Sequence, residues 1–198
     1  AEFGMDVRLP HMRFAAVQAS PVFGGKLKRF DQAAVMQMPG VKQVVGREDA
    51  VAVVADSTWR AKQALAALPV TWDEGAAASV SSDSILADFR AGLGESGKVV
   101  YKVGDAPAAM AAALKRIDAE YRIPFLAHAT MEPMNCTAWV KEDAAEIWVP
   151  TQAQQRAQEA AAKAAGLAKS NVQVHTTFLG GGFGRRFETD CITQAVTV

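Results

Sequence analysis

The chain has 198 residues, of which 50% are hydrophobic and 21% are charged, an ordinary composition for a globular protein. Its 21 basic and 21 acidic residues give a net charge of zero, so nothing indicates a nucleic-acid or polyanion surface. No apolar run approaches the roughly 20 residues that span a bilayer, and no basic-then-apolar signal peptide stands at the start.

The cysteines and histidines do not form any of the common metal-binding patterns. Cys136 and Cys191 make no CxxC pair and cannot ligate an iron–sulfur cluster alone; they could form one disulfide, but we expect reduced, buried thiols. His11, His128 and His175 lie far apart and form no HExxH motif, so no metal ligands are predicted among the side chains. Any redox chemistry would therefore need a cofactor held mainly by backbone and polar groups.

Residues 5–74 read as a compact α/β unit, because apolar runs alternate with turn signals. The run 51–55 does not alternate, so we expect a strand that is buried on both faces. Asp56 and Ser57 can cap the helix that follows, and Pro69 stops it. The apolar stripe of this helix is Ala61, Ala64, Leu65 and Leu68. The other predicted elements are strands over 12–18, 41–45 and 70–72 and a short helix over 31–38.

The middle of the chain looks less regular. Small residues without periodicity over 75–82 indicate a linker. Residues 83–115 mix short helical pieces with a strand-like run over 99–103 and an alanine-rich helix candidate over 106–114. We therefore predict an α/β domain over 1–75, a linker with connecting elements over 76–115, and a second domain over 116–198.

The second domain reads as strand, helix and strand. Its first three predicted strands cover 117–123, 136–141 and 146–149, and 142–145 joins the last two as a hairpin. A helix is expected to start at Thr151 with a capping box to Gln154, and Gly166 stands where a left-handed C-cap belongs. Its stripe of small residues is Ala153, Ala157, Ala160, Ala161 and Ala164. The strand 172–178 then runs into a loop, and ligand sites in α/β sheets favour the carboxyl ends of strands.

That loop is the most informative stretch of the chain. Its glycines are Gly180, Gly181, Gly182 and Gly184, with Phe183 inside the run and Arg185 and Arg186 directly after it. Consecutive backbone N–H groups in such a turn form an anion-binding concavity, and arginine suits phosphate. We predict that residues 180–185 bind a phosphate-bearing cofactor.

Other interpretations of the glycine loop stay open or fit badly. A turn that only reverses the chain is the simplest alternative. A Rossmann fingerprint starting at Gly180 would need glycine where Arg185 stands, and no Gly-Lys-Ser/Thr follows as in a P-loop. The apolar segment 191–198 has no partner in view, which suggests a fragment of a larger subunit.

Several stretches, in order, resemble the xanthine oxidase family of molybdenum hydroxylases. The resemblance to its small hammerhead domain rests on residues 14–21, 23–25, 38–41 and 51–74. The resemblance to the start of the molybdopterin-binding region of the large subunit rests on residues 132–138, 149–152 and 180–184. The pair Arg185-Arg186 is most similar to the isoquinoline 1-oxidoreductase β-subunit and aldehyde dehydrogenase branch.

The resemblance implies an α+β fold, with a hammerhead-like domain followed by the first part of a molybdopterin-binding domain. Family members use a molybdenum–pterin cofactor, usually the cytosine dinucleotide form in bacteria, to hydroxylate an aldehyde or N-heteroaromatic carbon with oxygen from water. Electrons leave through 2Fe–2S clusters on a small partner subunit. The amides of residues 181–184 would lie beside the molybdenum ligands or the pterin dithiolene, and Phe183 would wall the metal pocket. The family's catalytic glutamate lies beyond residue 198, so this chain alone should be inactive.

Four positions depart from the family's pattern or have more than one reading. Leu126 stands where many members have a glutamine that approaches the metal's apical ligand. Arg185 replaces a glycine and could meet a phosphate, an acidic partner or only solvent. His128 could line the pocket, although a structural role is favoured. Glu132 could be a general base, but we favour a glutamate that fixes a turn.

Two further functions are kept beside the molybdenum hydroxylase. The chain could be a non-catalytic interaction or scaffold module that holds a partner subunit. A Rossmann nucleotide-binding protein is disfavoured by Arg185 and by the lack of an acidic ribose ligand roughly 20 residues beyond the loop. The compartment stays open between cytoplasm and periplasm, since any export signal would precede Ala1.

Overall fold

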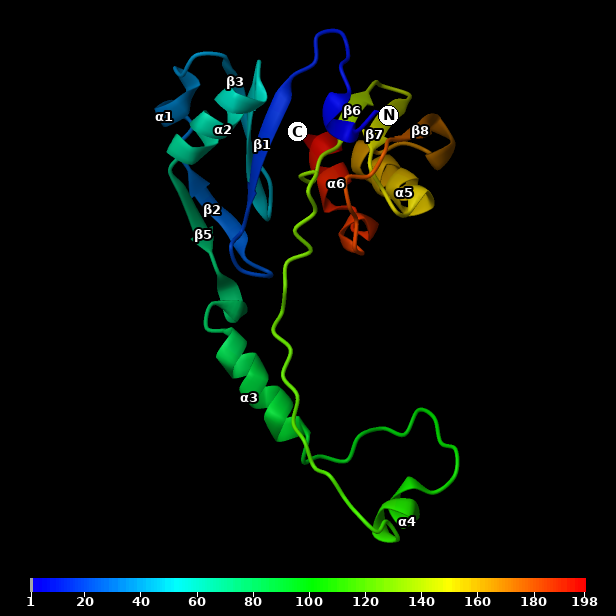
Figure 1. Cartoon of the computed structure of the whole chain (residues 1–198). Coiled ribbons are helices and arrows are strands. Elements are labelled where there is room, and N and C mark those ends of the chain that lie inside the picture. Colours follow the sequence, from blue (N-terminus) through cyan, green and yellow to red (C-terminus); the bar gives the residue numbers. More distant parts are fainter. Residues whose placement is uncertain (1) are drawn as a thin grey trace. The chain divides into compact units, whose positions relative to one another are not determined.

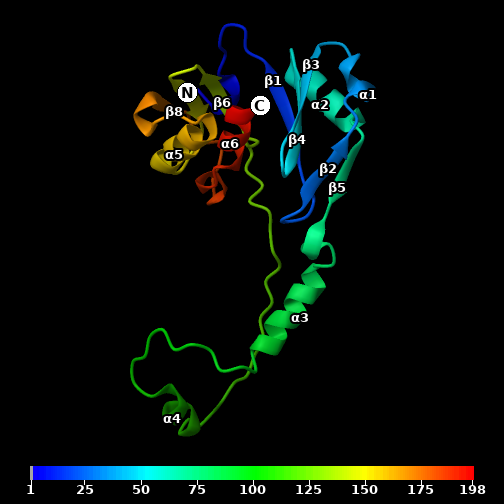
Figure 2. The same cartoon turned by 180° about the vertical axis from the view of Figure 1, so that it is seen from behind.

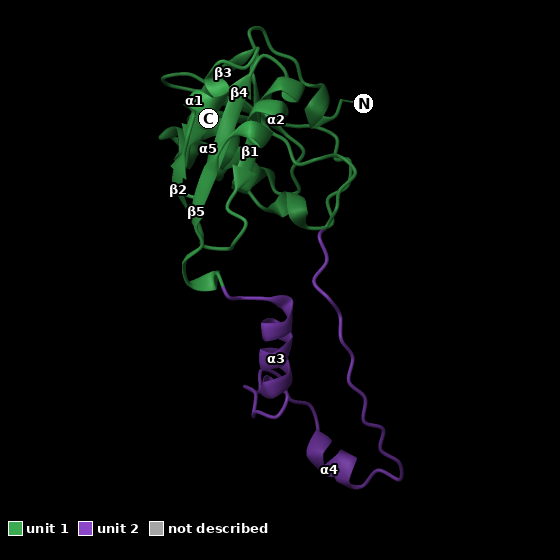
Figure 3. Cartoon of the chain, turned by 90° about the vertical axis from the view of Figure 1, so that its left-hand side faces the viewer, with its two compact units in different colours: residues 1–78, 128–198 green, residues 79–127 purple. Residues whose placement is uncertain are grey.

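The structure, a computed structural model, describes residues 2–198 (Figure 1, and from behind in Figure 2). Its contacts divide the chain into two compact units (Figure 3). The larger unit joins the residues up to 78 with 128–198, and the smaller unit covers 79–127. Among the described residues, all the strands lie in the larger unit, in three sheets.

The N-terminal half of the larger unit is built on a three-stranded antiparallel sheet of order β1-β4-β3, with β4 in the middle (Figure 2). Its strands are β1 (Phe14–Ala19), β3 (Val41–Gly46) and β4 (Ala50–Ala55). Every residue of β4 is buried, which confirms the prediction from its unbroken apolar run.

Two helices accompany this sheet, α1 (Ala33–Met36) and α2 (Thr58–Ala67). The Ser57 hydroxyl accepts a hydrogen bond from the N–H of Arg60, so Ser57 is the cap of α2, as predicted. Ala61 and Ala64 are fully buried on the packed face of α2, which confirms two members of the predicted stripe. The helix ends two residues before Pro69.

A two-stranded antiparallel sheet pairs β2 (Lys26–Phe30) with β5 (Val70–Asp73). The sequence predicted β5 but not β2, because Lys26, Lys28 and Arg29 interrupt the apolar pattern of that strand. The charges stand on an exposed strand, where only Leu27 and Phe30 are partly buried. A short 3-10 turn, η2 (Gly75–Ala77), follows β5.

The C-terminal half of the larger unit holds a sheet of order β6-β7-β8. Its strands are β6 (Thr137–Val140), β7 (Ala145–Val149) and β8 (Val172–Thr176), joined by α5 (Gln154–Ala165) and η3 (Lys169–Asn171). β6 and β7 form the predicted hairpin, and β8 pairs parallel to β7 after the crossover through α5. Gly166 closes α5 with a φ of 69°, which confirms the left-handed C-cap.

The predicted capping box of this helix is wrong. α5 begins at Gln154 with Ala153 as its N-cap residue. The Thr151 hydroxyl accepts from the N–H of Ala153 and donates to the carbonyl of Arg186 instead. Thr151 therefore joins the start of the helix to the segment that follows the glycine loop, which sequence spacing could not reveal.

The expectation that residues 191–198 lack a partner is also wrong. They form most of α6 (Asp190–Thr197), which packs against α5 and β6. Ile192 is buried in the same core as Ile147, Val149 and Ala161. Ile192 and Val196 stand four residues apart, so a helix places both on one face.

The smaller unit contains only two helices, α3 (Ser82–Gly92) and α4 (Ala106–Ala111). Both predicted strands in this part of the chain, 99–103 and 117–123, are wrong, since these residues are irregular. A strand needs a neighbour for its N–H and C=O groups, and neither segment pairs with any residue from 2 to 198. Their large apolar side chains are exposed, as at Val100 and Tyr121.

No helix in the described chain is both long and apolar enough to cross a membrane. The short 3-10 turns η1 (Gly4–Asp6) and η4 (Arg185–Phe187) complete the secondary structure. The domain boundaries expected at residues 75 and 115 stay predictions about the complete protein.

Candidate functional site

The glycine loop leaves the carboxyl end of β8, beside the carboxyl end of β7. The two strands are parallel in register from Ala145 and Val172 up to Val149 and Thr176. Both chains then turn out of the sheet, so residues 150–152 and 179–184 meet at one edge. The parallel pairing therefore places the predicted loop and the segment ending in Gln152 together.

The backbone of the loop needs its glycines. Gly181 and Gly184 have φ values of 95° and 93°, where side chains are disfavoured. Phe183 adopts a φ of 51° without being glycine, and its ring is 74% exposed. Such a left-handed conformation at a bulky residue stores strain, and strain of this kind clusters at functional sites.

Two of the glycines also leave no room for a side chain. A Cβ atom at Gly180 would lie 2.3 Å from the Cβ of Glu132. A Cβ atom at Gly182 would lie 2.7 Å from Oε1 of Gln152. The loop backbone therefore lies directly against these two neighbouring segments.

Hydrogen bonds fix the two ends of the loop but leave three N–H groups in its middle without a partner. The N–H of Gly180 donates to Oε2 of Glu132 at 2.9 Å, and the N–H of Gly184 donates to Oε1 of Gln152 at 3.1 Å. Between them, no hydrogen bond joins the N–H groups of Gly181, Gly182 or Phe183 to an acceptor within residues 2–198. Three successive donors remain for a ligand.

Arg186 is the arginine that turns inward, and its side chain is fully buried. Nε donates to the carbonyl of Gly181 at 2.7 Å, and Nη2 donates to the carbonyl of Glu132 at 2.7 Å. Nη2 also lies 3.0 Å from Oε2 of Glu132, which completes an ion pair. The guanidinium thus binds both the loop and the segment that faces it.

Glu132 is 8% exposed and accepts hydrogen bonds through both carboxylate oxygens. Oε1 accepts from the side-chain amide of Asn135 at 2.9 Å, while Oε2 accepts from Gly180 and Arg186. A carboxylate with these partners is held in place by the protein itself. The geometry agrees with a glutamate that fixes the chain rather than with a general base.

Arg185 points elsewhere and pairs with Asp190 in the first turn of α6. Its Nη1 and Nη2 donate to Oδ1 and Oδ2 at 2.8 Å and 2.6 Å. Burial raises the pKa of Asp190, but the hydrogen bonds and charge of Arg185, together with the backbone N–H groups of Asp190 and Cys191, leave this pKa below its ordinary value. The hydrogen bond to Asp190 raises the pKa of Arg185. Arg185 thus has an acidic partner within the chain, and its part in cofactor binding stays a prediction.

His128 lies beside the loop as an exposed side chain. Its Nε2 would be 3.8 Å from a Cβ built at Gly184. In the part of the chain that the structure describes, no three His, Cys, Asp or Glu side chains gather closely enough to hold a metal ion. Both cysteines are free thiols, and burial is the main cause that raises the pKa of Cys191 to about 11.

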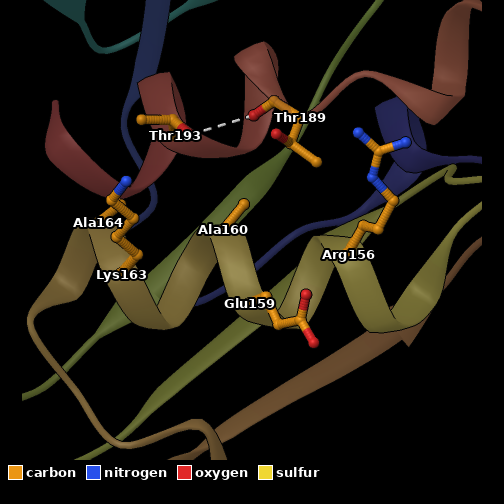
Figure 4. A pocket seen from close by; sticks show the side chains of 7 residues that line it. All are labelled: Arg156, Glu159, Ala160, Lys163, Ala164, Thr189 and Thr193. Carbon is orange, nitrogen blue, oxygen red and sulfur yellow. Dashed lines mark hydrogen bonds between the residues drawn. The ribbon is translucent and has the colours of Figure 1, made fainter.

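A separate hollow of about 480 Å³ opens between α5 and α6 (Figure 4). It is lined by Arg156, Glu159, Ala160, Lys163, Ala164, Thr189 and Thr193. None of these residues belongs to the glycine loop, and the charged side chains of the wall are one acidic and two basic ones, Glu159, Arg156 and Lys163. The hollow does not contribute to the site at the loop.

Sequence reasoning missed two residues of the site, Arg186 and Gln152. The sequence drew attention to both arginines but chose Arg185, because nothing in a pair of like residues tells which one the 3-10 turn buries. Gln152 stood in one of the stretches that carry the family resemblance, yet its contact with Gly184 spans 32 residues. Only the tertiary structure brings such residues together.

The sequence of the chain matches one family model and is similar to two known oxidoreductases. Residues 91–198 match the family model described as the molybdopterin cofactor-binding domain. The β-subunit of isoquinoline 1-oxidoreductase from Brevundimonas diminuta is 32% identical over 99% of this chain and 26% of its own length. A membrane-bound aldehyde dehydrogenase [pyrroloquinoline-quinone] from Gluconacetobacter polyoxogenes is 27% identical over 98% of this chain and 26% of its own length.

Solved structures share the fold. Quinoline 2-oxidoreductase from Pseudomonas putida 86 matches 93% of this chain and 29% of its own, with a TM-score of 0.67 and 18% identity. Aldehyde oxidoreductase from Desulfovibrio gigas matches 99% of this chain and 27% of its own, with a TM-score of 0.69 and 17% identity. The α+β fold expected from the motifs is confirmed. The chain spans about a quarter of the length of the curated relatives it matches.

Proposed function

Since the chain belongs to the family of molybdopterin cofactor-binding domains, as in the large subunits of the xanthine oxidase family, we propose that its glycine loop holds the pterin of a molybdenum cofactor. The complete protein would hydroxylate an aldehyde or an N-heteroaromatic compound with oxygen from water. It would pass the electrons to an iron–sulfur subunit, and its cofactor would be the cytosine dinucleotide form.

One observation carries this proposal. The N–H groups of Gly181, Gly182 and Phe183 follow one another and have no acceptor within residues 2–198, while hydrogen bonds fix the loop on either side of them. Successive free amides form a concavity that favours an anion. The phosphate and sulfur groups of such a cofactor would be anionic or strongly accepting. The residues present therefore fit the group.

The bound cofactor would supply the two-electron chemistry that no side chain provides. The three free amides would donate hydrogen bonds to its anionic edge and fix its orientation. Gly180 and Gly182 keep the loop close to Glu132 and Gln152. The exposed ring of Phe183 would cover the site and exclude water from one side.

The alternative is a non-catalytic module that holds a partner subunit. The smaller unit favours it, because many of its large apolar side chains are exposed and exposed apolar surface can serve as an interaction site. These side chains include Val99, Val100, Tyr101, Ile117, Tyr121 and Ile123. A protein of this kind would contain no pterin and would leave aldehydes and N-heterocycles unchanged.

Isotope labelling tests the proposed reaction on the complete protein with its copurifying partners. The protein would be incubated in ¹⁸O-water with an artificial electron acceptor and a panel of aldehydes and N-heteroaromatic compounds. We expect at least one product to carry ¹⁸O from water. Failure to oxidise any compound of the panel, or oxygen derived from O₂, would count against the proposed function.

The identity of the cofactor is tested separately. The name of the Gluconacetobacter relative includes pyrroloquinoline-quinone, so mass spectrometry of the extracted cofactor should distinguish the two kinds of group. We expect a pterin dinucleotide. Recovery of a quinone without pterin would overturn the assignment of the loop, and recovery of neither would favour the interaction module.

A further inference from the structure

We propose that the buried pair Arg186–Glu132 is a positioning device, which turns the free amides of the glycine loop toward the cofactor. The proposal rests on the proposed function, because it assigns a purpose to the direction of those amides. Arg186 and Glu132 touch the loop but contribute none of its three free donors, so they are positioning residues and not catalytic ones.

The first step is the pairing of Glu132 with Gly180. The N–H of Glu132 donates to the carbonyl of Gly180 at 3.0 Å, and the N–H of Gly180 donates back to Oε2 of Glu132. In a trans peptide the C=O and the following N–H point in opposite directions. Because Glu132 holds the carbonyl of Gly180, the N–H of Gly181 must point away from Glu132.

The second step is the hydrogen bond from Arg186 to the next carbonyl. The N–H at Nε of Arg186 donates to the carbonyl of Gly181 at 2.7 Å, which fixes the direction of that carbonyl. The same peptide geometry then turns the N–H of Gly182 away from the guanidinium. The N–H of Arg185 donates to the carbonyl of Gly182 at 2.8 Å, which fixes the N–H of Phe183 in the same manner.

The third step is the anchoring of the Arg186 backbone. Its own carbonyl accepts from the N–H of Gln152 at 3.1 Å and from the hydroxyl of Thr151 at 3.2 Å. These two residues follow Pro150 at the end of β7, so the chain leaving the sheet supports the arginine from its backbone side. The guanidinium then reaches across to Glu132, whose backbone and carboxylate both accept from Nη2.

Arginine suits this position better than lysine. Its planar fork serves the carbonyl of Gly181 through Nε and Glu132 through Nη2 at the same time. A lysine ammonium is a compact point charge and cannot reproduce that geometry. Arg186→Lys keeps the charge that neutralises Glu132 but should lose the hold on Gly181, so it separates positioning from charge balance.

Hydrogen exchange measured by mass spectrometry on the complete protein tests the proposal. In Arg186→Lys we expect exchange at the hydrogen-bonded amides of Gly180, Gly184 and Arg185 to rise more than tenfold, with exchange in β4 and α5 unchanged. Molybdenum content should fall in the same variant. The matched control is Arg60→Lys, which alters an exposed ion pair with Asp56 far along the sequence.

Glu132→Gln is the second variant, and the double variant should add little to either single change because the two residues act as one unit. Unchanged exchange at the loop, or a rise spread over the whole fold in both single variants, would overturn the proposal. A wild-type protein without molybdenum would refute the proposed function instead, since the loop's exchange pattern is measured independently of the metal.

Discussion

Gly180 shows at the scale of one residue how closely the loop is packed. Its φ is not in the left-handed region, so the constraint comes from space alone. Gly180→Ala should cost about 1–3 kcal/mol in the free energy of unfolding, because overpacking forces neighbouring groups to shift. Urea unfolding of the complete protein measures the change.

Gly97→Ala is the control for that change, since a Cβ there would have nothing within 4 Å. It should leave the unfolding midpoint unchanged or slightly raised. Equal effects of the two variants would show that the close approach of Gly180 to Glu132 is absent in solution.

Asp190 should make the stability of the fold depend on pH. Burial raises its pKa, but Arg185 and nearby backbone N–H groups together hold this pKa below the ordinary 3.8. A carboxyl group with a lowered folded-state pKa stabilises the protein above its unfolded-state pKa, and that contribution is lost as the pH falls through the folded value. Asp190→Asn should therefore lower stability at pH 7 by no more than about 1 kcal/mol, since the pair is partly exposed.

Thermal unfolding of the wild type and Asp190→Asn between pH 7 and pH 3 checks this prediction. The difference in Tm should be constant at neutral pH and shrink below pH 3.8. A difference that grows as the pH falls would contradict the assigned pair, because it would require a raised pKa.

At the scale of elements, α6 tests whether the C-terminal helix belongs to the core. Ile192 is 1% exposed and packs with residues of α5 and β7. Ile192→Ala should cost about 2–5 kcal/mol, as expected for a large core side chain that leaves a cavity. Leu93→Ala, at a position 76% exposed, should change stability by less than about 0.5 kcal/mol. Chemical denaturation compares the two, and equal small effects would mean that α6 is not docked.

The elements that the sequence predicted well were those with a strong local signal. β4 had an unbroken apolar run, α2 had a serine cap and a proline stop, and Gly166 marked the end of α5. β2 was missed because lysine and arginine hide its pattern. The strands expected over 99–103 and 117–123 have the right pattern, but a strand forms only beside another strand.

Some residues of the candidate site could likewise be predicted from local sequence, and others could not. The glycine loop was found from local sequence, because glycine density is itself a local signal. Glu132, Gln152 and Arg186 act across 32 to 54 residues of sequence, so their contacts could not be derived from spacing. The capping box at Thr151 failed for a related reason, since the hydroxyl serves the carbonyl of Arg186.

At the scale of the whole molecule, the family assignment depends on motifs spread along the chain. The match of residues 91–198 to the molybdopterin cofactor-binding domain supports the interpretation of the last quarter of the chain as part of such a domain. The likeness to solved structures, at 17–18% identity, supports the fold. The proposed function rests on the loop alone, because three of its backbone N–H groups have no acceptor among the described residues.

Molybdenum content of the complete protein, measured by elemental mass spectrometry after expression in a host that inserts the cofactor, tests this account most directly. We predict about one molybdenum atom per subunit, with loss of the metal in Gly182→Val, whose side chain would meet Gln152, and full retention in Gly97→Ala. A wild-type protein without molybdenum would contradict the account and reduce the glycine loop to a turn.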